Sequence, residues 1–215
     1  MKNLLFKEFK LNFSPFYILF ILLPAMVLIP NYPYLVGFIY IPISFIHIFN
    51  GGRENSEMYY TCLLPVKKTD IVKSKFIFVI IYELMSVIVA IPFLFLNGVI
   101  GFHNEAGCQA NWALLGIVFF MYGIFNLIFL SMFFKTCVKT GIPFLTASIT
   151  AILLAEILDV LMIAIPFLKD NINVSIISGN VSGQLAVLLI GIIIFISANL
   201  LAYSISKKEI GKVEL

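Results

Sequence analysis

The sequence predicts an all-α integral membrane protein with six transmembrane helices. Long runs rich in Leu, Ile, Phe and Val recur along the chain, and 61% of the 215 residues are hydrophobic. The mean hydropathy of +1.07 is too high for a soluble domain of this size, which could not cover such a core with polar surface. Only 12% of the residues are charged, and most of these lie in the segments that join the apolar runs.

The joining segments are alternately rich in basic residues and nearly free of them. Since short cytoplasmic loops retain Lys and Arg, this pattern predicts a multi-pass protein with both termini in the cytoplasm and an even number of spans. The Ile-, Phe-, Lys- and Asn-rich composition favours a bacterial plasma membrane. The same asymmetry explains the net charge of +3 without a nucleic-acid partner. Lys169 alone is expected outside; the basic residues expected inside are Lys2, Lys7, Lys10, Arg53, Lys67, Lys68, Lys73, Lys75, Lys135, Lys139, Lys207, Lys208 and Lys212.

The apolar runs place the spans in chain order. They are expected near residues 15–29, 34–49, 71–96, 112–134, 142–167 and 184–203. The second is expected to stop at Gly51 and Gly52, and the fourth opens on Trp112, a residue suited to the membrane interface. These spans predict a single transmembrane domain that covers residues 1–215. Its parts are an interfacial helix (1–13), spans one and two (14–50), a cytoplasmic loop (51–69), spans three and four (70–134), spans five and six (142–205) and a cytoplasmic tail (206–215).

Residues 1–13 have the pattern of an amphipathic helix that lies in the membrane interface. Leu5, Phe6, Phe9 and Phe13 share one face at helical spacing, while Lys7 and Glu8 are expected to point away from it. The alternative interpretation is a simple topogenic tail.

The loop between the second and third spans is the longest polar segment, and it predicts a short helix over 53–63. Glu54 and Glu57 lie near its start, where the helix dipole favours negative charge. It also carries more apolar and aromatic surface than a linker needs, from Met58, Tyr59, Tyr60 and Leu63. Such a helix would be a rigid connection between two spans and a cytoplasmic partner. The alternative is an interfacial re-entry loop with aromatic anchors.

Three carboxylates fall inside spans: Glu83, Glu156 and Asp159. A charged acid near the bilayer centre costs about 2.5–3.5 kcal/mol on insertion scales, so these residues are expected to face protein or water. Glu156 and Asp159 are three residues apart and share a helical face. That face either lines an internal cavity or subunit interface, or is satisfied by polar side chains of adjacent helices, such as Asn126.

No motif supports catalysis by this chain. The sequence contains no G-x-x-x-x-G-K-[S/T] phosphate-binding loop and no His-Glu-x-x-His zinc motif. His47 and His103 are expected on opposite sides of the membrane, so they cannot share a metal ion. We therefore expect no metal and no cofactor on this chain.

Residues 64–75, LPVKKTDIVKSK, resemble the stretch that enters the third span in the membrane subunits of ABC-2-type transporters. The preceding acidic and aromatic segment, the amphipathic N-terminus and the six-span layout are also similar to that family. The resemblance implies a permease of a small bacterial exporter, paired with a second copy or a paralogous permease. It further implies two ATP-binding cassette subunits that hold ATP and magnesium.

In that family the ATP-binding subunits dock against the cytoplasmic helix expected here at 53–63. The resemblance therefore assigns ATPase coupling to Arg53, Glu54, Glu57, Met58, Tyr59, Tyr60 and Leu63, and it relates 166–183 to the family's outer re-entrant helices. The implied substrate is amphipathic or hydrophobic, such as a peptide or bacteriocin. One alternative is the substrate-binding membrane component of an energy-coupling importer, although the first span is rich in Ile, Leu and Phe rather than small residues. Another is a membrane assembly or sensor protein that does not transport.

Overall fold

A computed structural model describes residues 2–12, 15–102, 104–137, 139–177 and 181–212 of the chain. The described residues form helices and loops, with no strand among them. The helices are α1 (Lys2–Asn12), α2 (Pro15–Leu22), the 3-10 helix η1 (Leu23–Leu28), α3 (Leu35–Glu54), α4 (Glu57–Leu63), α5 (Lys68–Ile100), α6 (Trp112–Thr136), α7 (Gly141–Ala164), α8 (Pro166–Asn171) and α9 (Val181–Ile210).

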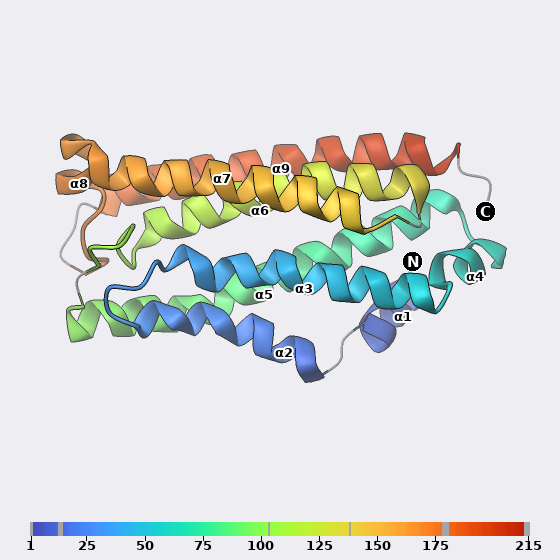
Figure 1. The fold of residues 1–215 in the computed structure, drawn as a ribbon, viewed down its shortest axis with the longest axis horizontal. Helices are drawn as coiled ribbons and strands as arrows, with labels where there is room; N and C mark the ends of the chain where they lie inside the picture. The colour runs from blue at the N-terminus through green and yellow to red at the C-terminus, as the bar shows by residue number, and fades with distance from the viewer. Residues whose placement is uncertain (1, 13–14, 103, 138, 178–180, 213–215) are drawn as a thin grey trace.

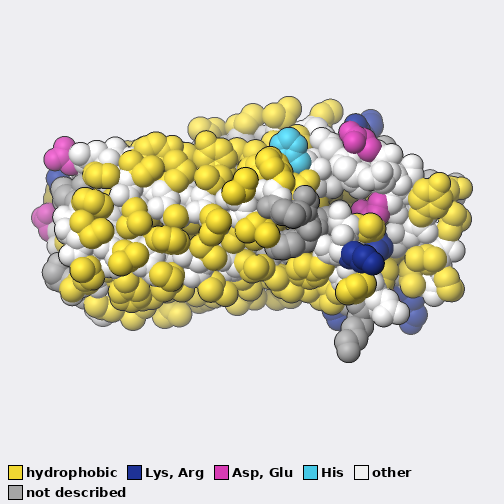
Figure 2. All heavy atoms as spheres, turned by 90° about the horizontal axis from the view of Figure 1, so that it is seen from below, with side chains coloured by type: hydrophobic (Ala, Val, Ile, Leu, Met, Phe, Trp, Pro, Cys, Tyr) yellow, Lys and Arg dark blue, Asp and Glu magenta, His cyan; other side chains and the backbone are white. Residues whose placement is uncertain are grey.

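The long helices lie side by side in an elongated bundle (Figure 1). One end, here called the α4 end, holds α1, α4 and the two ends of the chain; the opposite end, the α8 end, holds α8 and the connection from α5 to α6. Hydrophobic side chains cover the long middle of the face in Figure 2, and the charged side chains on that face lie toward its two ends. This distribution is the one that a bilayer around the middle of the bundle requires.

The predicted all-α membrane fold is confirmed. Five described helices are long and apolar enough to span a membrane: α3, α5, α6, α7 and α9. The count reaches six when the segments Asn3–Leu11 and Phe16–Leu28, which meet at 91°, are taken as one bent span. The straight part of that span, α2 with η1, is about 24 Å long from its helical rises, close to the ~30 Å of a hydrocarbon core.

Two groups of helices make up the bundle: α7 and α9 each pack against α6, and α2, η1, α3 and α5 form the second group. The tightest contact lies between α6 and α9. A Cβ atom added to Gly191 of α9 would stand 2.1 Å from the carbonyl oxygen of Gly116 on α6, and one added to Gly123 would stand 2.9 Å from the Cα of Phe195. Small residues at these positions therefore let the two backbones meet, as expected for helices packed within a membrane.

The structure corrects the expected helix boundaries around the second span. The helix does not stop at Gly51 and Gly52, because α3 continues through both to Glu54. The expected helix over 53–63 is interrupted at Asn55 and Ser56, so that only Glu57–Leu63 forms α4. The two glycines cost α3 about 1 kcal/mol each in helix propensity, and packing within the bundle overrides a cost of this size.

Two other boundaries differ in detail. The region expected as the fifth span divides at Ile165 into α7 and α8, with Pro166 opening the second helix. A proline is favoured in the first turn of a helix, where its missing N–H has no partner to lose. At the far end of the chain, α9 continues to Ile210, so the first five residues of the expected tail, 206–210, are helical.

Candidate functional site

Helix α4 packs across the α4 end of the bundle, held in place by sharp turns on both sides. Ser56 has a left-handed backbone with φ of 50°, which reverses the chain between α3 and α4. The side chain of Asn55 donates a hydrogen bond of 2.9 Å to the carbonyl oxygen of Gly51 and closes the last turn of α3. At the other end Leu64 is extended, and Pro65 follows it. The proline ring makes the helical conformation unfavourable for the residue before it, so α4 ends at this point.

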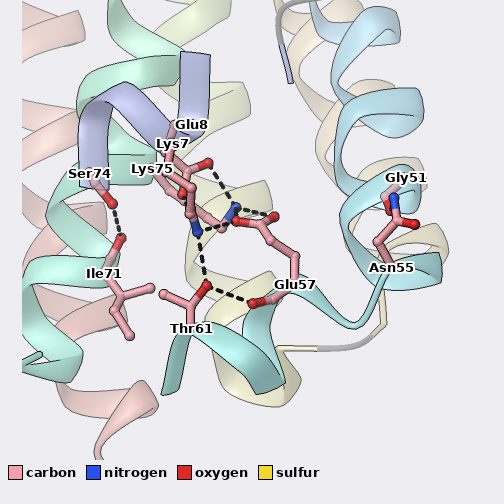
Figure 3. A network of polar contacts seen from close by, with 9 residues as sticks. All are labelled: Lys7, Glu8, Gly51, Asn55, Glu57, Thr61, Ile71, Ser74 and Lys75. Carbon is pink, nitrogen blue, oxygen red and sulfur yellow. Dashed lines mark hydrogen bonds and ion pairs between the residues drawn. The ribbon is translucent and has the colours of Figure 1, made fainter. Parts of the chain in front are cut away.

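The inner face of α4 carries Glu57, Met58 and Thr61, all buried. Beneath it, four charged side chains from three helices meet; we call Lys7, Glu8, Glu57 and Lys75 the charge cluster (Figure 3). Lys7 and Glu8 come from α1, Glu57 from α4 and Lys75 from α5. The cluster therefore joins the N-terminal helix and the short helix to one of the long helices.

The contacts of the cluster are short and reciprocal. Lys7 Nζ lies 2.5 Å from Glu57 Oε1 and 3.2 Å from Glu8 Oε1, and Lys75 Nζ lies 3.1 Å from Glu8 Oε2 and 3.0 Å from Glu57 Oε2. Lys7 also donates a hydrogen bond of 2.9 Å to the Thr61 hydroxyl, which itself donates to the carbonyl oxygen of Glu57 at 2.6 Å. Each carboxylate thus contacts both ammonium groups.

The charges of the cluster balance, and all but Lys7 are nearly removed from water. The side chains of Glu8, Lys75 and Glu57 are 1%, 6% and 8% exposed, and that of Lys7 is 20% exposed. Burial alone would raise the pKa of Glu57, but the charges of Lys75 and Lys7 and their hydrogen bonds outweigh it and lower the pKa to about 2. Removing one partner from such a buried group leaves an unpaired charge and costs several kcal/mol.

The outer face of α4 is apolar and exposed. Tyr59 is 48% exposed, Tyr60 64% and Leu63 65%, and the two tyrosine rings contact each other edge to face at 5.7 Å. Tyrosine is enriched at the centres of protein interfaces and also at the membrane–water interface. The helix therefore has an anchored face and a free face.

The residues predicted to couple to the ATPase fall in three places: the exposed face of α4, its buried face and the end of α3. Tyr59, Tyr60 and Leu63 lie on the exposed face of α4, while Glu57 and Met58 are buried beneath it. Arg53 and Glu54 are exposed, but they belong to the last turn of α3.

Sequence reasoning missed the partners of Glu57. The sequence predicted only that Lys7 and Glu8 point away from the apolar face of α1; it did not predict that Glu8 is buried or that both side chains form ion pairs within the cluster. Phe6 is 67% exposed, as a side chain on a face directed toward the membrane interface would be, and Phe13 lies outside the described residues. One signal for Lys75 was present, because its neighbours at helical spacing, Ile71, Val72, Phe76 and Val79, are all apolar and buried.

The three predicted intramembrane acids lie on two helices, Glu83 on α5 and both Glu156 and Asp159 on α7. Glu83 of α5 is buried and accepts a hydrogen bond of 2.8 Å from Asn126 of α6, which also donates to Asn199 of α9 at 3.2 Å. Asp159 is buried at the α8 end, where its carboxylate accepts the backbone N–H of Cys108 at 2.9 Å. Glu156 is half-buried. Asn126 was considered as a partner for the Glu156 and Asp159 pair, but the acid that it contacts is Glu83.

A cavity of about 820 Å³ opens at the α8 end between α5, α7, α8 and the loop that precedes α6. The loop is held by buried amides: the backbone N–H of Gln109 donates to Asn173 at 2.6 Å, and Asn111 donates to the carbonyl oxygens of Ile172 and Val174 at 3.0 Å. Glu105, Lys169 and Asp170 contribute charge to its lining, and neither Glu156 nor Asp159 is part of it.

Within the described residues no three His, Cys, Asp or Glu side chains lie together in a way that could hold a metal ion. His47 is exposed on α3, and His103 lies outside the described residues.

Comparison with known protein families gives a match that extends over nearly the whole chain. The family model described as "ABC-2 family transporter protein" matches residues 3–209. No curated protein and no solved structure matched the chain.

Proposed function

The chain belongs to the ABC-2 family of transporter proteins and is a permease subunit of an ABC transporter, and we propose that it exports an amphipathic or hydrophobic substrate, such as a peptide or bacteriocin. Membership of this family implies an ATP-binding cassette partner. ATP and magnesium would be bound by that subunit, and the permease would act as a pair with a second copy or with a paralogous permease.

The observation that carries the proposal is the two-sided character of α4. Its exposed face offers Tyr59, Tyr60 and Leu63 to a partner, while its buried face is tied by Glu57 to α1 and α5. A partner that pushes on the exposed face would move three helices together, because the ion pairs resist separation of any one of them. We therefore assign docking of the cassette subunit to the exposed face and transmission to the charge cluster.

The α4 end would face the cytoplasm. The basic residues of the termini and of the segments around α4 gather there, as the positive-inside pattern requires. In this orientation α5 begins at the charge cluster and continues to the border of the 820 Å³ cavity at the opposite face. ATP-driven movement of α4 would be carried along α5 and would open or close that cavity, from which the substrate would leave.

The proposal is tested by expressing the chain together with the cassette subunit encoded next to it and purifying the complex through the permease. Tyr60→Ala should weaken retention of the cassette subunit at least tenfold, because truncation of an aromatic anchor commonly costs 2 kcal/mol or more. Phe167→Ala is the matched control, since Phe167 is an equally exposed aromatic side chain (67%) at the α8 end. Failure of the wild-type chain to retain a folded cassette subunit, or equal loss in both variants, would refute the proposal.

A further inference from the structure

A second surface of the bundle has the characteristics of a ligand site: an apolar groove of about 610 Å³ between α5 and α9. Its walls include Phe76, Ile80 and Leu84 from α5 and Phe195, Ile196 and Leu200 from α9. These positions fall on one face of each helix, so the groove runs along both helices where the two groups of the bundle meet.

The groove has the length of one membrane leaflet. Lys73 and Leu84 border it on α5, and Ile192 and Tyr203 border it on α9. Either pair spans about 16 Å along its helix, and half of a ~30 Å hydrocarbon core is about 15 Å. A single acyl chain that enters from the α4 end would fill it.

The α4 end of the groove is basic. Lys73 lines it and is exposed, and Lys207 is also exposed one turn beyond Tyr203, on the same face of α9 as Leu200. Neither lysine forms an ion pair with another described residue, in contrast to Lys7 and Lys75 of the charge cluster. The opposite end of the groove is bordered by apolar residues, Leu84 and Ile192.

The lysines at the α4 end of the groove, rather than its apolar walls, determine which lipid headgroup is favoured at this site. An acyl chain gains little by leaving other acyl chains for an apolar wall, so the apolar groove alone would not select one lipid over another. Basic residues near the membrane surface do select anionic headgroups, by about fivefold for each Lys or Arg. We propose that the α5–α9 groove binds one anionic phospholipid, with its acyl chain between the two helices and its phosphate between Lys73 and Lys207.

The occupied groove would lie beside the link between the two groups of helices. Asn199, which is part of the groove wall, receives a hydrogen bond from Asn126, and Asn126 also contacts Glu83 on α5. A lipid in this place would therefore stabilise one spacing of α5 and α9. The inference concerns the lipid site alone and does not depend on the identity of the transported substrate.

Native mass spectrometry of the full-length chain in detergent tests the proposal, with dioleoyl phosphatidylglycerol as the anionic probe and dioleoyl phosphatidylcholine as the zwitterionic one. We expect one phosphatidylglycerol per chain, bound more tightly than phosphatidylcholine. Lys73→Gln with Lys207→Gln should weaken phosphatidylglycerol binding about 25-fold, from fivefold for each lysine. The matched control, Lys135→Gln with Lys208→Gln, removes the same charge from exposed lysines of the α4 end and should change binding less than twofold.

A second variant, Ile80→Trp, fills the groove without changing any charge. It should also reduce phosphatidylglycerol binding, while its elution in size-exclusion chromatography stays that of the wild-type chain. Equal affinity for the two lipids, or equal weakening by the two lysine pairs, would overturn the proposal. A groove that instead closes against a second copy would also overturn it; in that case Ile80→Trp would convert a dimer to a monomer and leave lipid binding unchanged.

Discussion

Neutralising Glu57 is the sharpest test of the charge cluster. The change Glu57→Gln keeps the shape of the side chain but leaves Lys7 and Lys75 with Glu8 as their remaining acidic partner in the cluster. The difference between the ordinary pKa of 4.5 and the value of about 2 in the fold corresponds to about 3 kcal/mol of stabilisation of the charged form. We therefore expect the variant to lose about 3 kcal/mol, within the range known for broken buried ion pairs.

The loss of stability in Glu57→Gln should first appear as local unfolding around α1, before the whole bundle unfolds. Because α1 is joined to α4 and α5 through the cluster, α1 should detach first and become sensitive to protease. The measurement is limited proteolysis of the full-length chain in detergent micelles, followed by denaturant unfolding of the same sample. Glu54→Gln is the matched control, since Glu54 is exposed at the neighbouring end of α3 and should change stability by less than 0.5 kcal/mol. Equal protease sensitivity and equal stability of the two variants would refute the role given to the cluster.

Three further outcomes follow from the same contacts. Because the pKa of Glu57 is lowered in the fold, the charged carboxylate stabilises the fold fully above about pH 4.5, and this contribution is lost as the pH falls toward 2. The protection of α1 from protease should therefore decrease over that pH range, and it should decrease less in Glu57→Gln. Gly191→Ala should destabilise the chain strongly in denaturant unfolding because its methyl group meets the α6 backbone, whereas Gly51→Ala, with no atom within 4 Å, should stabilise α3 by about 0.5–1 kcal/mol. Asn126→Leu should cost about 1–3 kcal/mol by leaving the Glu83 carboxyl without its hydrogen-bond partner, and adding Glu83→Leu should recover part of that loss.

The fold could be predicted from the sequence because its signals are local. Each signal lies within a window of about twenty residues: an apolar run long enough to span a bilayer, a basic loop, or the amphipathic N-terminal segment. They predicted a membrane bundle with both ends of the chain on one side, and Figure 1 shows the two termini at the α4 end. The exposed aromatic face of α4 was also predictable, since Tyr59, Tyr60 and Leu63 stand close together in the chain.

The charge cluster could not be predicted because its contacts are long-range. Glu57 is 50 residues from Lys7, and Lys75 is 67 residues from Glu8. Helical periodicity shows that Glu8 shares a face with Leu4, but it does not show that the Glu8 carboxylate forms an ion pair with a lysine of another helix. A substitution such as Glu57→Lys would therefore test the integrity of the cluster before it tests coupling, because it would leave three lysines with one glutamate.

The most direct test of the account is site-specific photo-crosslinking from α4 in the assembled transporter. A photoreactive amino acid placed at Tyr60 should crosslink to the ATP-binding cassette subunit, and the same group placed at Phe167 should not. A crosslink from Phe167, or none from Tyr60 in a complex that hydrolyses ATP, would contradict the claim that the exposed face of α4 receives the partner.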